Sequence, residues 1–446
     1  MKNFFTTLSN IWKIEDLRVR ITNTLLFVLI YRVGCVVILP GVDPKSISSH
    51  AAEGLLGLMN MFAGGAFQHA SIFALGVMPY ISASIVVQLL GIAVPYFAKL
   101  QKEGESGQNK INQWTRYLTI GITVLQAIGY LKTQVTGDAR MIAEPFFTIL
   151  NVFVLTSGTL FVMWLGERIT DKGIGNGISL IIMVGIIAQL PSAFGYEFAN
   201  RTSGNGGLVA FVVELVALIG VIMFTILIVQ GTRKIAVQYA KRIVGNKQYG
   251  GVRQYIPLKV NAAGVMPIIF AQALMFIPAY IPSLFPSTAS NPVVMALGNS
   301  NSWGHNLVFA ILIILFTYFY TAITVNPNQM AEDMKKNGGF IPGVKPGRAT
   351  ANFIDDIISK ITLPGSIALA IIAIIPPIAT SIGIQPIFAR FFGGTSLIIL
   401  VGVVLDTLQQ IESHLLMRHY DGLMKTGRIK GRTAVASSAG STPPVI

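Results

Sequence analysis

The chain has 446 residues, of which 52% are hydrophobic and only 12% are charged, whereas about 25% of the residues of a soluble globular protein are usually charged. This composition excludes an ordinary soluble domain and indicates a membrane protein with several spans. The formal net charge is +14, but the basic residues stand between apolar stretches, which is typical of cytosolic loops rather than of a nucleic-acid surface. Cys35 is the only cysteine, so the chain can form no internal disulfide.

Residues 1–20 mix apolar and basic side chains and are expected to form a cytosolic interfacial helix rather than a signal peptide. A bilayer core takes about 20 apolar residues per helix. Ten stretches meet or approach this length, and they lie near residues 21–39, 76–98, 117–136, 146–166, 174–194, 208–229, 262–284, 306–325, 361–383 and 395–414. Proline and glycine positions between them, including Pro191, are read as turns outside the helices. Residues 415–446 are expected to form a cytosolic tail.

Lysine and arginine fall almost entirely in the loops on one side of these spans, which predicts that both termini are cytosolic. Five spans followed by five place two halves, residues 21–194 and 195–414, in opposite orientations. Such an inverted repeat has its transport pathway at the interface of the halves. The sequence therefore predicts an all-α, polytopic membrane protein with ten transmembrane helices in two inverted five-helix halves.

Two predicted cytosolic loops stand out, residues 231–259 and 326–360. The first has seven basic residues and no acidic one. One interpretation is a topology signal that also attracts anionic lipid headgroups. The other is a docking surface for a large cytosolic partner.

The stretch from Asn60 to Gln88 is apolar enough for a membrane but is interrupted where a plain span would not be. Gly64 and Gly65 break the backbone, and irregular backbone at membrane depth must be covered by protein or line a cavity. Pro79 suits the first turn of a following helix. A broken span of this kind suggests a pathway through the molecule.

Catalytic and metal-binding patterns are not found in the sequence, so neither an enzyme nor a cofactor is expected. The glycine-rich stretch Lys172–Ser179 lacks the features of a phosphate-binding loop and is interpreted as a tight turn between two spans. Ion-coupled transport would require ionisable residues inside the spans. Arg32, Glu214 and Asp406 are the few candidates, and they support an ion relay only weakly.

Long stretches of the chain carry specific motifs rather than generic apolar runs. They are MFAGGAFQHASIFAL at 61–75, FALGVMPYISASIVVQLL at 73–90, KEGESGQNKINQWTRY at 102–117, MWLGERITDKGIGNGISLII at 163–182, YAKR at 239–242, PLKVNAAGVMPIIFA at 257–271, FYTAITVNPNQMAEDMKKNGGFIPGVKPG at 319–347 and GGTSLIILVGVVLD at 393–406. Together they resemble the SecY family, the channel subunits of the bacterial Sec protein-export translocon. The resemblance covers most of the chain.

This resemblance implies a clamshell-shaped protein-conducting channel in the bacterial cytoplasmic (inner) membrane. It would pass unfolded secretory polypeptides across the membrane and release apolar segments sideways into lipid. The implied partners are SecE-like and SecG-like small subunits, the SecA motor ATPase, the ribosome, precursor polypeptides and membrane lipids, with no direct nucleic-acid substrate. The alternative is a secondary transporter or ion channel of another family, which carboxylates at the membrane midplane would favour.

The resemblance also assigns roles to individual residues. A pore ring, in which stiff isoleucine side chains would exclude water by dewetting, would consist of Ile81, Ile85, Ile182, Ile186, Ile269 and Ile399. A plug at 60–75 would include Phe62, Gly64, Gly65, Ile72 and Phe73. A lateral gate would contain Gln88 and Asn261. Partner docking would involve Arg233, Lys241, Arg242, Arg253, Lys345 and Arg348.

On their own, these isoleucines are typical of core or lipid-facing positions, and the two polar gate residues of ordinary interhelical hydrogen bonding. One position departs from the family. Pro342–Gly347 reads PGVKPG where the family usually has Pro-Gly-Ile-Arg-Pro-Gly, so that Lys345 replaces an arginine. Either Lys345 supplies the positive charge needed there, or Arg348 has taken over the contact.

Overall fold

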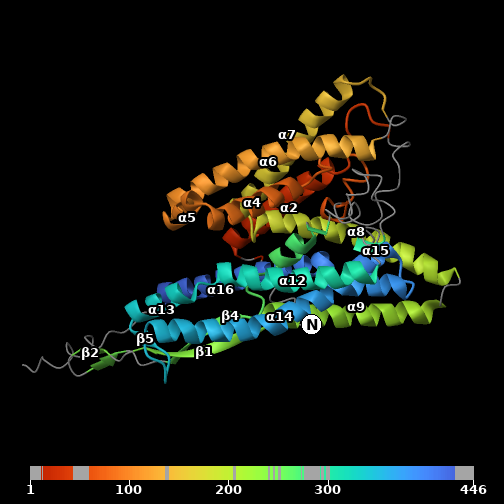
Figure 1. Ribbon diagram of the computed structural model, residues 1–446. Coiled ribbons are helices and arrows are strands. Elements are labelled where there is room, and N and C mark those ends of the chain that lie inside the picture. Colours follow the sequence, from red (N-terminus) through yellow and green to blue (C-terminus); the bar gives the residue numbers. More distant parts are fainter. Residues whose placement is uncertain are drawn as a thin grey trace, which may run out of the picture.

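The computed structural model describes residues 14–43, 60–135, 140–203, 207–239, 242–244, 247–249, 253–272, 274–275 and 302–426, with a few isolated positions between them. Long helices dominate it, and in the view of Figure 1 the helices of the first half lie above those of the second half. The helices before residue 204 are α2 (Glu15–Gly34), α4 (Met78–Ala93), α5 (Pro95–Lys102), α6 (Glu105–Gln134), α7 (Phe146–Lys172) and α8 (Gly177–Thr202).

The second half is built in the same way from long apolar helices joined by shorter ones. Its elements are α9 (Gly207–Gln230), α12 (Trp303–Thr324), α13 (Pro327–Lys336), α14 (Arg348–Ser381), α15 (Pro386–Ala389), the 3-10 helix η4 (Arg390–Phe392) and α16 (Gly394–Thr426). Packing of α12 on α14, and of α16 on α8 and α9, joins these helices to one another and to the first half.

Among the described residues, six helices are long and apolar enough to cross a membrane, and the bent pair of α4 and α5 would make a seventh span. The predicted spans at 21–39 and 117–136 overlap α2 and α6, which are long but less apolar, and α2 begins at Glu15, inside the stretch expected as an interfacial helix. The C-terminal part of the span predicted at 262–284 lies outside the described residues. The observed helices thus occupy the positions that the apolar stretches predict.

Two predicted boundaries are wrong. The span expected at 76–98 is not one continuous helix, because the chain breaks at Val94 and the two helices meet at 101°. Pro95 explains the break, since a proline disfavours helical backbone at the residue before it.

Pro191 does not mark a turn, because it lies inside α8. Membrane helices tolerate an internal proline where neighbouring groups satisfy the freed backbone. The helix continues to Thr202, so the expected division between residues 194 and 195 falls within it.

The predicted loop at 231–259 forms β-structure, which the all-helical expectation missed. Its strands are β1 (Thr232–Tyr239), β2 (Arg242–Val244), β3 (Lys247–Tyr249) and β4 (Arg253–Lys259), with β1 antiparallel to β4 and β2 antiparallel to β3. The alternation of buried Ile235 and Val237 with exposed or half-buried neighbours is the signal for β1.

A further strand connects the two predicted cytosolic loops. β5 (Gly339–Phe340), from the loop at 326–360, pairs with the end of β1 and completes a sheet of order β4-β1-β5. Ile235, Val237, Met334, Ile341 and Ile354 form a small apolar core beneath it. The sheet and α13 lie together at one end of the molecule (Figure 1).

Candidate functional site

The segment at 60–75 begins with a short helical turn at 60–62 and continues as a compact series of turns shortly before α4. It is called the plug segment below. Gly64 and Gly65 have φ angles of +63° and +89°, a left-handed conformation that glycine adopts without a Cβ penalty. The paired glycines therefore interrupt the regular backbone after residue 62, as the sequence predicts.

Protein surrounds the plug segment on nearly every side. Met61, Ala66, Phe67 and Phe73 are all buried. Irregular backbone at membrane depth needs such cover, because lipid cannot hydrogen bond to it. Three helices of the first half supply much of it.

Helix α2 contacts the plug segment through donors near its C-terminus. The Arg32 guanidinium donates from Nη1 to the Gly64 carbonyl oxygen at 2.9 Å, and the Tyr31 hydroxyl donates to the Ala63 carbonyl oxygen at 3.4 Å. The Tyr31 ring also stacks on Phe73, with 6.1 Å between the ring centroids. Arg32, a lone ionisable residue in a predicted span, thus has a partner that the sequence did not reveal.

Helices α6 and α8 supply two further donors. The Tyr130 hydroxyl donates to the Phe67 carbonyl oxygen at 2.7 Å. The Gln189 amide donates from Nε2 to the Asn60 carbonyl oxygen at 2.8 Å. All of these acceptors are main-chain oxygens, which explains why no side-chain motif announces the contacts.

The helices α2, α6, α7 and α8 form the wall around the plug segment. Glycines in this wall let the plug backbone approach closely. A Cβ added at Gly185 of α8 would lie 2.7 Å from the Phe62 carbonyl oxygen, and one added at Gly158 of α7 would lie 2.2 Å from the Ile72 carbonyl oxygen. Small residues allow such close backbone contacts between membrane segments. Because these two glycines of α7 and α8 have no side chain, the backbone of the plug segment fits directly against the two helices.

Four of the six isoleucines assigned to the pore ring lie with the plug segment. Ile182, Ile186 and Ile399 are members of the same buried apolar cluster as plug residues such as Phe62 and Phe73, and Ile81 packs against it. The other two do not belong to this cluster: Ile85 is buried on α4 and Ile269 is half-buried.

Gln88 and Asn261 are not paired with each other. Gln88 is exposed and donates from Nε2 to the Ser84 hydroxyl of its own helix at 3.4 Å. Asn261 is buried, and its Oδ1 has no hydrogen-bond partner within the described ranges. The structure therefore provides no contact that would identify these two residues as a gate.

The residues expected to dock a partner lie near the three-stranded sheet where they are described. Arg233 on β1 and Arg253 on β4 are exposed, as are Lys345 and Arg348 after β5. Of the other two residues in this set, Arg242 belongs to β2 and Lys241 lies outside the described residues. Pairing of β5 with β1 brings both predicted loops to one surface.

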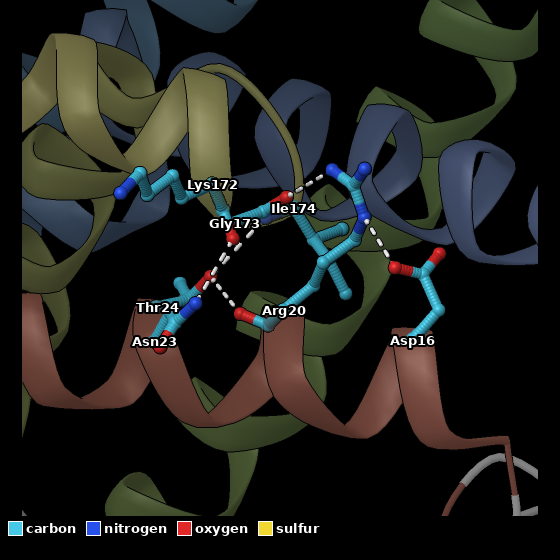
Figure 2. A network of polar contacts seen from close by, with 7 residues as sticks. All are labelled: Asp16, Arg20, Asn23, Thr24, Lys172, Gly173 and Ile174. Carbon is cyan, nitrogen blue, oxygen red and sulfur yellow. Dashed lines mark hydrogen bonds and ion pairs between the residues drawn. The ribbon is translucent and has the colours of Figure 1, made fainter.

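The glycine-rich stretch after α7 is a tight turn, as the sequence predicts. In Figure 2, Arg20 donates from Nη1 to the Gly173 carbonyl oxygen at 3.3 Å, and the Ile174 N–H donates to the Thr24 hydroxyl at 3.1 Å. On its other side, the Gly175 N–H donates to Oε1 of Gln410 in α16 at 2.8 Å. Because side chains already accept from these N–H groups, the turn offers no cradle for a phosphate.

A buried ion cluster joins α8 to α9. Arg201 contacts Glu197 at 2.9 Å and Glu214 at 2.5 Å, and it donates to the Gly383 carbonyl oxygen at 3.0 Å. Glu214, a candidate for an ion relay, is therefore paired within the structure. The spacing of Glu197 and Arg201 by four residues could have indicated this pair, because such residues share a helix face.

The family model for SecY matches residues 71–408. The protein translocase subunit SecY of Streptomyces scabiei is 42% identical over 438 residues, which cover 94% of this chain and 100% of the relative. The chain belongs to the SecY family.

Other SecY relatives and solved channels agree with this assignment. The protein translocase subunit SecY of Mycobacterium bovis is 44% identical over 441 residues, covering 92% of this chain and 97% of the relative. A solved structure described as a protein conducting channel aligns with a TM-score of 0.63 at 17% identity, covering 89% of this chain and 92% of its own. Sec61 in a canine ribosome-channel complex aligns with a TM-score of 0.57 at 16% identity, over the same shares of the two chains.

The SecY fold accounts for the arrangement described above. Apart from its short strands, the chain is an all-α polytopic membrane protein in the SecY clamshell of ten helices. A transporter or ion channel of another family is not favoured, because the SecY match extends over nearly the whole chain. Within the described ranges, no group of His, Cys, Asp and Glu could hold a metal ion.

Proposed function

We propose that this SecY-family chain is the protein-conducting channel of a bacterial translocon and that it passes unfolded secretory polypeptides across the cytoplasmic membrane. One observation carries the proposal: the plug segment packs in a single apolar cluster with Ile182, Ile186 and Ile399. A transporter for small solutes needs polar side chains at this place. A narrow apolar waist with a removable stopper instead suits a flexible chain of any sequence.

At rest, the isoleucine ring and the plug act together. Isoleucine has no polar side-chain atom, so a constriction lined by Ile81, Ile182, Ile186 and Ile399 stays dry and resists ions. The plug segment, residues 60–75, closes the space on the outer side of this ring. Ile85 and Ile269 complete the ring as the halves rearrange.

During transport, the two halves, residues 21–194 and 195–414, separate at their interface. The precursor displaces the plug, and apolar segments leave sideways into lipid between α4 and the helix after Asn261. Gln88 and Asn261 line this lateral gate. The buried Oδ1 of Asn261, which has no hydrogen-bond partner among the described residues, supports a role in a rearranging contact.

A partner supplies the driving force. Four exposed basic residues, Arg233, Arg253, Lys345 and Arg348, lie on or near the three-stranded sheet and form a basic docking surface for a SecA motor or a ribosome. Lys241 and Arg242 are further candidates for this role. Both termini lie on this cytosolic side of the inner membrane. SecE-like and SecG-like subunits cover lipid-facing helices.

The apolar ring is tested by Ile399→Asn and Ile81→Asn in channels reconstituted with their small partners and the motor. A polar side chain lowers the cost of water in the constriction, so both variants should raise the resting ion leak and admit precursors with defective signals. Ile371→Asn on the exposed face of α14 is the control and should do neither. Unchanged leak and unchanged signal selectivity in both ring variants would contradict the proposal.

A further inference from the structure

The wall holds the plug segment by its main chain. Side chains of α2, α6 and α8 donate hydrogen bonds to carbonyl oxygens of Asn60, Ala63, Gly64 and Phe67. Two of the plug's own polar side chains bond within the segment, where the Asn60 amide donates to Oε1 of Gln68 at 3.2 Å. The donors on α2, α6 and α8 therefore bind main-chain carbonyl oxygens, which every polypeptide has.

Arg32 differs from the other donors because it is charged. A cation inside a membrane span is costly unless it is paired. Within the described ranges, no carboxylate lies within ion-pairing distance of Arg32, and its acceptor is the Gly64 carbonyl oxygen at 2.9 Å. If the plug left and nothing replaced it, this half-buried guanidinium would lose that acceptor.

An unfolded precursor brings its own acceptors. Its main-chain carbonyl groups are strong acceptors that lack internal partners in an extended chain. They are chemically the same as the Gly64 carbonyl, and a guanidinium has five N–H groups that can donate hydrogen bonds to them. An exchange of one carbonyl for another would keep the cation satisfied in both states.

We propose that Arg32 is a positioning residue that binds the Gly64 carbonyl at rest and binds main-chain carbonyls of the translocating polypeptide once the plug is displaced. The proposal rests on the plug role stated above and adds the residue that couples plug release to the arrival of substrate. Since the acceptor is a main-chain group, the contact is independent of the precursor's sequence.

The first test is the resting ion leak of reconstituted channels carrying Arg32→Met, Arg32→Gln or Arg32→Lys. Loss of a charged donor should raise the open fraction, and hence the leak, by about tenfold in Arg32→Met. Arg32→Lys keeps a cationic donor and should restore most of the seal, which a role in packing alone would not predict. Arg32→Gln keeps an uncharged donor and should fall between the two, and it replaces Arg32→Met in the comparison if that variant fails to accumulate.

A control removes an arginine that does not contact the plug. Arg168 lies over the Trp164 ring at 5.4 Å in α7, so Arg168→Gln should leave the leak at the level of the unmodified channel. A wild-type leak in Arg32→Met or Arg32→Gln, or equal leaks in Arg32→Met and Arg32→Lys, would overturn the proposal.

The second test asks whether the precursor reaches Arg32. An arrested precursor with photoreactive residues along its mature part should crosslink to residues 31–34 of α2 in the otherwise native channel, as mapped by mass spectrometry. Crosslinks that map only to other helices would overturn the exchange. If these tests fail while tethering the plug to the wall still blocks translocation, only the role of Arg32 is wrong; if tethering does not block it, the plug role itself is wrong.

Discussion

Gly64 and Gly65 share a left-handed backbone but have different surroundings. A Cβ added at Gly64 would lie 2.7 Å from Nη1 of Arg32 and 2.9 Å from Cα of Gly185, whereas at Gly65 the nearest atom would be 3.8 Å away in the His69 ring. Both positions disfavour a side chain by about 1–2 kcal/mol through backbone conformation alone. Only at Gly64 would a side chain also collide with the surrounding helices.

This difference predicts unequal effects of the same substitution. Gly64→Ala should unseat the plug segment and raise the resting ion leak well above that of Gly65→Ala, because both changes strain the backbone but only the first collides with the wall. The measurement compares the two variants in vesicles of one composition. Equal leaks would mean that plug conformation, rather than its seat, sets the seal.

Arg201 lies at a second position where one side chain satisfies several groups. It neutralises Glu197 and Glu214, both buried, and contacts the Gly383 carbonyl oxygen. The Gln385 N–H also donates to Glu197 Oε2 at 2.8 Å. The cluster therefore ties the junction of α8 and α9 to the segment after α14.

Removal of this arginine should destabilise the protein strongly. Arg201→Met leaves two buried carboxylates without their cation, and breaking a buried pair costs about 3–5 kcal/mol. The thermal unfolding midpoint of the purified channel should fall clearly. Lys360→Met, which breaks an exposed pair with Asp356, should cost only about 0–1 kcal/mol; similar shifts in the two variants would contradict the account.

At the scale of elements, the apolar stretches predicted the long helices well, because span length is set by bilayer thickness. The β1–β4 hairpin was missed because its basic residues were interpreted as a topology signal, which hid the short alternation around Ile235 and Val237. The partners of Arg32 and Tyr130 could not be predicted, since their acceptors are main-chain oxygens of a distant segment. Such contacts leave no pattern in a single sequence.

The turn after β5 contains Lys345, the lysine that stands where the SecY family usually has an arginine. Its side chain is exposed, and its carbonyl oxygen accepts from the Thr350 hydroxyl at 2.9 Å, which fixes the turn against α14. Arg348 is also exposed but already belongs to α14. The two basic side chains therefore project from different elements, so Arg348 cannot simply take the position of Lys345.

We expect Lys345 to supply the positive charge that the motor needs. Lys345→Glu should lower motor-driven export, whereas Lys345→Arg and Arg348→Glu should remain near normal, because a charge is required at the turn rather than on the helix. Export of a precursor into vesicles measures all three. A selective defect in Arg348→Glu would transfer the role to the helix, and full activity throughout would remove this turn from the docking surface.

At the scale of the whole molecule, one apolar cluster joins the two halves around the plug segment. It includes Tyr31 of α2, Ile186 of α8, Phe388 of α15 and Ile399 of α16, together with Phe67 of the plug. The inverted halves were predicted from an odd number of spans per half and from family resemblance. The contacts of the plug with α2, α6 and α8 emerged only from the structure.

On the proposed function, the plug segment must leave its seat for a polypeptide to pass. Phe67 and Tyr130 contact each other edge to face, with ring centroids 4.8 Å apart. Phe67→Cys and Tyr130→Cys, introduced together with Cys35→Ser, can therefore be joined by a short reducible thiol crosslinker. The measurement is motor-driven translocation of a precursor before and after the linker is cleaved. The account predicts a block that cleavage reverses, with each single-cysteine variant unaffected by the reagent; translocation at the unlinked rate through the tethered channel would contradict it.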